Sequence, residues 1–316
     1  MNTFTIILFN LVLGTLLVVY GVKLLSFGLE KANMNIIKKL LSMFAGKVWT
    51  AFLSSTVITA LVQSSTAITV ITVGFVNAGL IQLPQAIGII YGTNIGTTVT
   101  AQLMSFKIAN FAMPIVIVGL LVLILSKKHS LKNVGIAVLG FGLMLLGIKV
   151  LNLGVPYINN SKEVYEIFKL YGQNPYIGLL IGMVTTMLVH SSSATVGLTI
   201  VLFNAGLISF SSAIGLTLGD NIGTCITAQV ASIGTGVYAR RTAWAHTLYN
   251  IIGVGIALLF LKPFTQITQY ITFSLGQGKT MLVANSHSIF NILSALVFLP
   301  FTKYYVKFIE YIIPDN

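Results

Sequence analysis

Two clusters of hydroxyl side chains are the residues in this sequence best suited to binding chemistry. The first reads Gln63-Ser64-Ser65-Thr66-Ala67 and the second reads His190-Ser191-Ser192-Ser193-Ala194. Hydroxyls at a helix break combine side-chain donors with free backbone N–H groups and the partial positive charge of a helix N-terminus, which together favour an anion. The same hydroxyls and freed carbonyl oxygens also suit a hard cation such as Na⁺. We therefore expect a small-ion site at each cluster, with His190 tuning the second.

A second motif with closely spaced glycines follows each cluster. It reads Gly92-Thr93-Asn94-Ile95-Gly96-Thr97-Thr98 in the first half and Gly219-Asp220-Asn221-Ile222-Gly223-Thr224-Cys225 in the second. Glycines four apart allow a helix to unwind or another helix to approach closely. The Asn and Thr side chains between them supply oxygen atoms of the kind that bind hard cations. The candidate Na⁺ ligands are Asn94, Thr97, Asp220, Asn221 and Thr224, and the neighbours expected to tune the site are Thr98, Cys225, Gln102 and Gln229.

Asp220 is the only acidic residue deep in an apolar segment of the sequence. Carboxylates at membrane depth are costly and are functional candidates by default. Three roles stay open: Asp220 binds Na⁺, carries a proton, or pairs with His190. A purely structural ion pair is the remaining alternative. Thr93 occupies the equivalent position in the first half, so the predicted site is asymmetric.

The two motifs belong to an internal repeat. Residues 62–102 match residues 189–229 at a constant offset of 127, with 21 of 41 positions identical. Polar residues and glycines account for many of the identities, which chance matching of apolar sequence does not produce. Upstream, Gly14, Gly21, Lys23 and Gly28 recur as Gly140, Gly147, Lys149 and Gly154 at an offset of 126. Such a pattern is typical of a duplicated transporter half.

Composition indicates a membrane protein. Charged residues make up 8% of the 316 residues and hydrophobic residues 56%, whereas an ordinary soluble domain carries roughly 25% charged residues. So few charges exclude a cytosolic enzyme, a disordered scaffold and a nucleic-acid-binding protein. The single cysteine, Cys225, has no partner for an intrachain disulfide.

Seven apolar segments are expected to span the membrane, and two more are expected to enter it without crossing. The segments 48–80 and 176–208 carry Ser-Ser at their centres, which leaves arms of roughly 14 residues, or ~21 Å of helix. Because a span must cross ~30 Å of hydrocarbon, each segment is expected to be a re-entrant hairpin with its polar tip at membrane depth. The expected spans are 4–29, 84–106, 108–126, 133–153, 212–233, 243–262 and 280–300.

The placement of Lys and Arg predicts the orientation. With both hairpins re-entrant, eleven of these residues fall on one side of the membrane and five on the other, so the positive-inside rule places the eleven in the cytoplasm. The N-terminus is then outside, the C-terminus is cytoplasmic, and the repeats are inverted, as in secondary transporters. We expect an all-α, multi-pass plasma-membrane protein with a first repeat at 1–132, a second at 133–262, and a final span and tail at 263–316. Each repeat is expected to contain one re-entrant hairpin and one Gly-broken transmembrane helix.

The two motifs together resemble those of the type II sodium–phosphate cotransporters. That family is marked by two Gln-Ser-Ser-Ser-like signatures in inverted repeats, each followed by Gly-x-Asn-Ile-Gly-Thr. The resemblance covers essentially residues 4–300 and implies Na⁺-coupled transport of inorganic phosphate, with Na⁺ as coupling ion and no other cofactor. It implies phosphate contacts at Gln63, Ser64, Ser65, Thr66, Ser191, Ser192 and Ser193. Two residues depart from the family pattern: His190 replaces the second Gln, and Asp220 is an extra acid.

The resemblance also indicates partners. Many bacterial relatives carry a C-terminal cytoplasmic domain that resembles phosphate-regulatory helical bundles. This sequence ends at Asn316, so we expect such control to come from a separate protein. The other expected partners are phosphate, Na⁺ and the lipid bilayer, with no nucleic acid, and a homo-oligomer stays open.

Alternating access around a midplane site is the expected mechanism. No Lys or Arg lies in either signature, and phosphate carries roughly one to two negative charges at neutral pH. We therefore expect no basic residue at the anion site, so that bound Na⁺, helix dipoles and hydroxyls neutralise the anion.

Four alternatives to Na⁺-coupled phosphate transport stay open. These are phosphate export, carriage of another small oxyanion, a channel, and an intramembrane serine hydrolase built on Ser191–Ser193, His190 and Asp220. The first repeat argues against the hydrolase, because Gln63 and Thr93 stand where the base and the acid would be.

Overall fold

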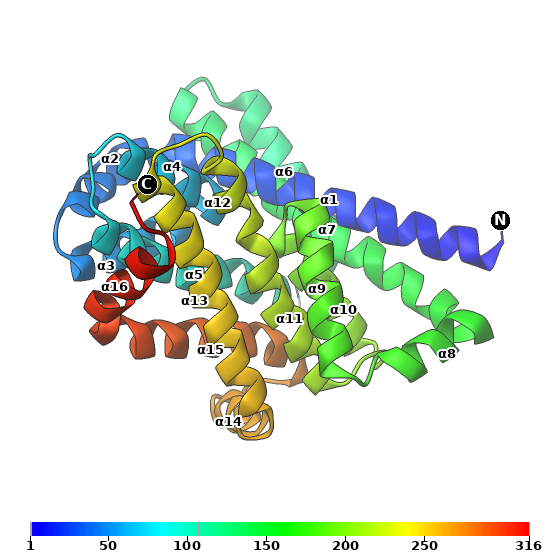
Figure 1. The fold of residues 1–316 in the computed structure, drawn as a ribbon. Helices are drawn as coiled ribbons and strands as arrows, with labels where there is room; N and C mark the ends of the chain where they lie inside the picture. Colours follow the sequence, from blue (N-terminus) through cyan, green and yellow to red (C-terminus); the bar gives the residue numbers. More distant parts are fainter. Residues whose placement is uncertain (1, 107, 316) are drawn as a thin grey trace.

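The computed structural model describes residues 2–106 and 108–315, and the regular elements within these ranges are helices (Figure 1). Lys107, which the orientation argument counts on the outer side, lies outside the described residues. The first part of the chain forms α1 (Thr3–Ala32), α2 (Met34–Ser42), α3 (Val48–Val62), α4 (Ser65–Asn77), α5 (Leu83–Ser105) and α6 (Ala112–Leu125).

The second part of the chain is also helical and contains more helices than the first. It begins with α7 (His129–Asn160), α8 (Lys162–Tyr171), α9 (Pro175–Val189), α10 (Ser192–Asn204), α11 (Phe210–Thr224) and α12 (Ile226–Ala231). The helices that follow are α13 (Val237–Leu259), α14 (Leu261–Ser274), α15 (Leu282–Phe298) and α16 (Thr302–Ile312). Short 3₁₀ turns occur at Met43–Ala45, Ala109–Phe111, Lys279–Met281 and Leu299–Phe301.

Four helical stretches within the described residues are long and apolar enough to cross a membrane: α1, α7, α13 and the run Lys279–Ile312, which contains α15 and α16. A fifth candidate span is the pair of helices α5 and α6, whose axes are bent by 79° relative to each other. Large apolar side chains such as Leu188 and Leu259 are 77% and 82% exposed, as expected for surfaces that lipid covers. The helical membrane protein is thus confirmed, while the seven crossings stay a proposal.

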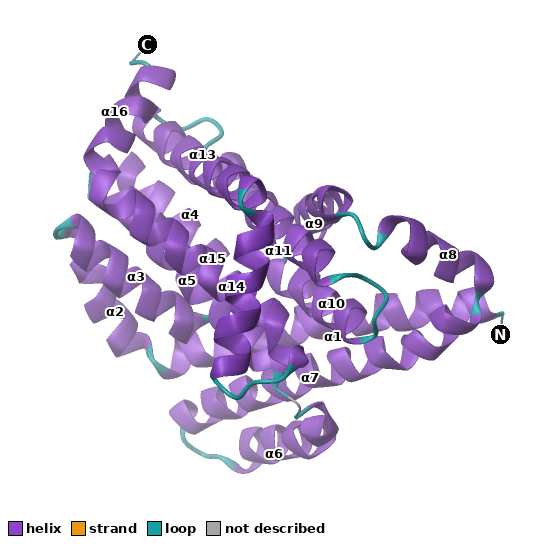
Figure 2. Ribbon diagram, turned by 90° about the horizontal axis from the view of Figure 1, so that it is seen from below, coloured by secondary structure: helices purple, strands orange, loops and turns teal. Residues whose placement is uncertain are grey.

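Helices α1 and α7 lie side by side over much of their length (Figure 2). A Cβ added at Gly21 would lie 2.3 Å from the backbone nitrogen of Met144, and one at Gly140 would lie 2.2 Å from that of Leu25. Small residues let membrane helices approach this closely. The glycines that recur at an offset of 126 therefore form one tight antiparallel interface between the two helices.

Each hydroxyl cluster interrupts a helix where the sequence indicates a break. Gln63 separates α3 from α4 with φ of 55°, and His190 separates α9 from α10 with φ of 51°. Left-handed backbone is uncommon for residues other than glycine. The serine after each one caps the next helix, because its Oγ accepts from the backbone N–H three residues further on at 3.3 Å. The two breaks thus have the same local geometry.

The glycine motifs behave differently in the two repeats. Helix α5 runs unbroken through the first motif, so the Gly-broken helix expected in the first repeat is wrong. In the second repeat, α11 ends at Thr224 and α12 begins at Ile226, so the helix is interrupted at Cys225.

The glycines of both motifs pack closely against the first helix of a broken pair, which is α3 for α5 and α9 for α11. A Cβ at Gly92 would lie 2.2 Å from the carbonyl oxygen of Phe52 in α3, and one at Gly219 would lie 2.0 Å from that of Leu179 in α9. Helix α5 therefore holds α3, and α11 holds α9, at backbone contact distance.

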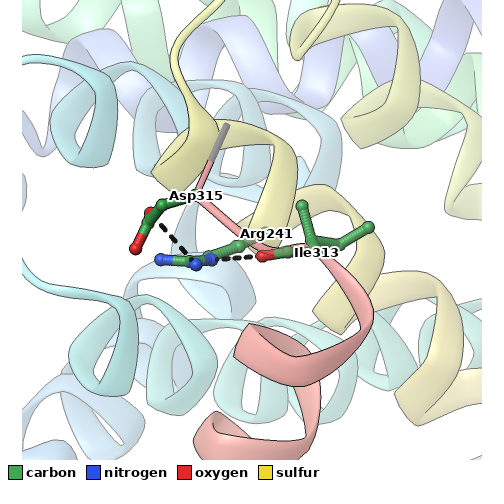
Figure 3. A network of polar contacts seen from close by, with 3 residues as sticks. All are labelled: Arg241, Ile313 and Asp315. Atoms are coloured by element: carbon green, nitrogen blue, oxygen red, sulfur yellow. Dashed lines mark hydrogen bonds and ion pairs between the residues drawn. The ribbon is translucent and has the colours of Figure 1, made fainter.

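The C-terminal segment is fastened to α13 through Arg241 (Figure 3). Its Nε donates to the carbonyl oxygen of Ile313 at 2.8 Å, and its Nη2 lies 3.1 Å from Oδ1 of Asp315. The guanidinium also lies over the ring of Tyr238, 5.3 Å from the centroid. The side chain of Arg241 is 4% exposed and that of Asp315 is 73% exposed. Because exposed ion pairs contribute little, the bond to the carbonyl oxygen of Ile313 is the stronger of the two contacts that Arg241 makes with the C-terminal segment, while the ring contact with Tyr238 lies within α13.

Candidate functional site

The two helix breaks face one cavity of about 330 Å³. Since a water molecule takes up about 30 Å³ of liquid, the cavity has room for a small hydrated anion. Its wall includes Thr97 of α5, part of α1 and His190. It also includes all the residues predicted to contact phosphate: Gln63, Ser64, Ser65, Thr66, Ser191, Ser192 and Ser193. Clusters 127 residues apart in sequence are thus brought to the same site.

Gln63 shapes the first tip. Its side chain is 7% exposed overall; Oε1 accepts from Oγ1 of Thr100 at 2.6 Å, and Nε2 donates to the carbonyl oxygen of Ala60. The carbonyl oxygen of Gln63 itself accepts from Oγ of Ser26 at 2.9 Å. These bonds tie the left-handed residue to α1, α3 and α5, so the tip is held from three sides.

Asp220 lies behind the second tip and is 1% exposed. Its Oδ1 accepts from Oγ1 of Thr186 at 2.8 Å, and Oγ1 of Thr195 lies 2.7 Å from Oγ1 of Thr186. Within the described residues, Oδ2 has no hydrogen-bond partner. Buried polar atoms normally have partners, and a cation or a proton would satisfy this one. His190 is exposed, and the described residues contain no ion pair between it and Asp220, so that suggested pairing is wrong.

A second, smaller cavity lies at the second tip and is bordered by Thr186. Its volume is about 10 Å³, close to the space that one water-sized sphere needs. The lining residues are Thr66, Thr186, His190, Ser191, Ser192, Gly223, Thr224, Ile226 and Thr227. Thr186 is thus both a wall of this cavity and the donor to Asp220.

The predicted Na⁺ ligands are divided between cavity walls and helix contacts. Thr97 lines the larger cavity and Thr224 the smaller one. Asn94 lines neither and donates from Nδ2 to Oδ1 of Asn250 in α13 at 2.9 Å. Asn221 lines neither and donates from Nδ2 to the backbone carbonyl of its own helix at 2.7 Å. The structure does not bring the five predicted ligands to one point.

The residues predicted to tune the site mostly join helices. Gln102 of α5 donates from Nε2 to Oγ of Ser288 in α15 at 2.9 Å. Gln229 of α12 donates from Nε2 to Oγ1 of Thr247 in α13 at 2.7 Å. Two further tuning candidates are buried: Thr98 and Cys225.

Helix α1 contributes three polar residues that the motif search missed. Lys23, Ser26 and Glu30 line the same cavity as the two tips. The expectation that no basic residue lies at the anion site is therefore wrong. The sequence did carry one signal, because Lys23 recurs as Lys149 in the repeat. That signal did not indicate which of the two lysines would face the cavity.

Membrane-spanning helices and two broken helices whose polar tips share one cavity define a protein of the membrane transporter class. The chain belongs to the Na⁺/Pi-cotransporter family, whose sequence profile matches residues 17–152 and 159–297. Membership of a transporter family confirms that the chain is not an enzyme, and the hydrolase alternative is rejected.

Relatives of known name cover different shares of the chain. "Uncharacterized protein YqeW" of Bacillus subtilis is 33% identical over 93% of this chain and 94% of its own length. "Putative inorganic phosphate export protein YjbB" of Escherichia coli K12 is 29% identical over 98% of this chain, which spans 56% of that protein. "Sodium-dependent phosphate transport protein 2A" of the mouse is 29% identical over 46% of this chain and 25% of its own length. No solved structure matches the chain.

Proposed function

We propose that this protein is a secondary transporter that couples movement of inorganic phosphate to the Na⁺ gradient by alternating access. The single observation that carries the proposal is the cavity shared by both hydroxyl tips. Family membership supports the choice of phosphate and Na⁺.

The anion is assigned to the two tips. Helices α4 and α10 begin at Ser65 and Ser192, and both residues line the cavity. Two helix N-termini therefore direct backbone N–H groups and partial positive charge toward a bound phosphate. Apart from the amide of Gln63, the remaining predicted contacts are hydroxyls, which donate to phosphate oxygens at a smaller desolvation cost than charged groups.

Sodium is assigned to the second repeat behind the tip. Asp220 provides a buried carboxylate oxygen that has no partner among the described residues, and Thr186, which donates to the other oxygen of this carboxylate, lines the small cavity. Thr224 supplies a hydroxyl on the same wall. Oxygen ligands of this kind suit a hard cation, and the position next to Ser191 and Ser192 lets the cation offset the charge of phosphate.

Inverted repeats provide the two conformations. The equivalent left-handed breaks, serine caps and glycine contacts of α3–α5 and α9–α11 support two related halves. With the N-terminus outside, the two hairpins would enter from opposite faces of the plasma membrane. Rearrangement of one half against the other would then expose the tips to each side in turn.

Phosphate export is the second candidate. The observation that favours it is the match of 98% of this chain to YjbB, whose name describes export. Export and uptake use the same site, so the distinction concerns the direction of the net gradient rather than the residues.

The test is uptake of radiolabelled phosphate into proteoliposomes that contain the purified protein. We expect an inward Na⁺ gradient to stimulate uptake over an equal K⁺ gradient. Ser192→Ala should weaken apparent phosphate affinity roughly 3- to 10-fold, the effect of one neutral hydrogen bond. Ser274→Ala, at the exposed end of α14, is the matched control and should behave as the parent.

Three results would contradict the proposal. If the rate of phosphate uptake does not change with the imposed Na⁺ gradient, transport is not coupled to Na⁺. If sulfate or arsenate competes more strongly than unlabelled phosphate, the preferred substrate is another oxyanion. Non-saturable flux indicates a channel.

A further inference from the structure

Lys23 is a basic residue on the wall of the cavity that holds both tips. It projects from α1 together with Ser26 and Glu30, which follow at three and seven residues and therefore lie on the same helical face. Neither motif contains these residues, because they precede the first tip by more than 30 positions.

The position of Lys23 along α1 places it within the membrane. Helix α1 has 30 residues, so it is about 45 Å long and exceeds the ~30 Å of hydrocarbon. With the excess shared between its ends, roughly five residues at each end lie outside the hydrocarbon, and Lys23, nine residues before Ala32, lies inside it. Ionisable residues at such depth are costly and normally face a watery cavity or a partner.

One hydrogen bond fixes Lys23 relative to the anion-binding tip. Oγ of Ser26 donates to the carbonyl oxygen of Gln63 at 2.9 Å. Because Lys23 lies one helical turn from Ser26 on the same face, its flexible four-carbon stem begins next to the first tip. Lys23 therefore lines the same cavity as the hydroxyl residues Ser65 and Ser192.

Glu30 does not neutralise this charge. It lies two turns from Lys23, about 10 Å along the helix axis. Within the described residues, Lys23 forms no ion pair. Snorkelling of Lys23 to lipid headgroups is the competing explanation, but it does not account for a lysine that lines a cavity of hydroxyls.

We propose that Lys23 is the cationic ligand of the transported anion in this conformation. It adds a full positive charge to the hydroxyls and helix N-termini of the tips, so phosphate is neutralised by the protein as well as by Na⁺. The inference rests on the proposed phosphate site and names its charged ligand.

The first experiment compares Lys23→Gln and Lys23→Arg with Lys31→Gln. Lys31 lies on the same helix, outside the cavity lining, with its ammonium over the ring of Phe27. Phosphate-induced thermal stabilisation of the purified protein measures binding without transport. We expect Lys23→Gln to raise the apparent Kd for phosphate roughly 10- to 100-fold, the loss of one charge-assisted hydrogen bond. Lys23→Arg should retain most of the affinity, and Lys31→Gln all of it.

A second experiment restores the charge within one folded protein. Lys23→Cys is treated with a cationic or an anionic methanethiosulfonate reagent, and the parent chain controls for the buried Cys225. The cationic adduct should recover phosphate affinity and the anionic adduct should not. Equal effects of both reagents, or an unchanged Kd in Lys23→Gln, would overturn the proposal.

Binding and coupling are separated by this design. If phosphate binding depends on Lys23 but uptake does not respond to Na⁺, the proposed coupling is refuted and the role of Lys23 as a phosphate ligand is supported. If Na⁺-driven uptake is normal in Lys23→Gln, the role of Lys23 as a phosphate ligand is refuted and Na⁺-coupled phosphate transport is supported. Absence of phosphate binding to the parent chain refutes both.

Discussion

Gly219→Ala tests whether backbone contact between α11 and α9 holds the second half of the site in shape. The added Cβ would lie 2.0 Å from the carbonyl oxygen of Leu179 and 2.8 Å from the backbone nitrogen of Met183. Both atoms belong to the backbone of α9, so no side-chain rotation relieves the clash. Ordinary contact begins at 3.4 Å, and α9 must therefore move by about 1.4 Å.

Two opposing terms set the stability change. Overpacking costs about 1–3 kcal/mol, and the upper end applies because the obstacle is backbone. Alanine favours the helix over glycine by about 1 kcal/mol. We therefore expect a net loss of about 2 kcal/mol in the free energy of unfolding for Gly219→Ala.

The functional effect is expected through Thr186, which α9 also carries. Its Oγ1 donates to Oδ1 of Asp220 at 2.8 Å, and a movement of about 1.4 Å takes that distance out of hydrogen-bonding range. A hydrogen bond to a charged group contributes about 1.5–3 kcal/mol. Phosphate uptake at low Na⁺ should therefore fall roughly 10- to 100-fold.

Thermal unfolding in detergent and proteoliposome uptake measure the two effects. Gly74→Ala in α4 is the matched control, because no atom of the described residues that could clash lies within 4 Å of its added Cβ. We expect it to be neutral or stabilising by up to about 1 kcal/mol. If Gly219→Ala and Gly74→Ala have the same melting temperature and the same uptake, the reasoning from backbone contact is refuted.

Three other predictions concern separate parts of the molecule. Asp220→Asn keeps an acceptor for Thr186 but removes the charge, so the Na⁺ concentration for half-maximal uptake should rise at least ~10-fold, and an unchanged value would place Na⁺ elsewhere. Arg241→Ala should destabilise the docked C-terminal segment by about 1–3 kcal/mol, which faster proteolysis of that segment would measure. Asp315→Asn should change the stability of the segment by less than about 1 kcal/mol, because the carboxylate of Asp315 is exposed. Cys225, 2% exposed, should react slowly with a small thiol reagent and more slowly with Na⁺ plus phosphate; indifference to both ligands would separate Cys225 from the site.

The helix breaks could be predicted because the relevant physics is local. Arms of roughly 14 residues are too short to cross a bilayer, and serine at the centre caps a new helix. The left-handed residues could not be predicted, because Gln63 and His190 lack the conformational freedom that makes glycine the usual choice. Their backbone is held by contacts from other helices, such as the Ser26 bond to Gln63.

The glycine motifs show where sequence spacing stops being informative. Spacing of four residues suits both an unwound helix and a closely packed one. At Gly92 the glycine allows close packing and not unwinding, because α3 lies directly against α5 there. Lys23 illustrates the same limit for the site, since α1 lies far from the tips in sequence and meets them only in the folded chain.

The internal sequence repeat allows matched positions of this chain to be compared with each other. Gly88, Gly92 and Gly96 recur as Gly215, Gly219 and Gly223, and a Cβ at each would meet the neighbouring arm at under 3 Å. Positions that carry ligand chemistry, such as Thr93 and Asp220, differ between the copies while the contacts around them are kept. A carboxylate thus stands in one copy and a hydroxyl in the other, among glycine contacts that both copies keep.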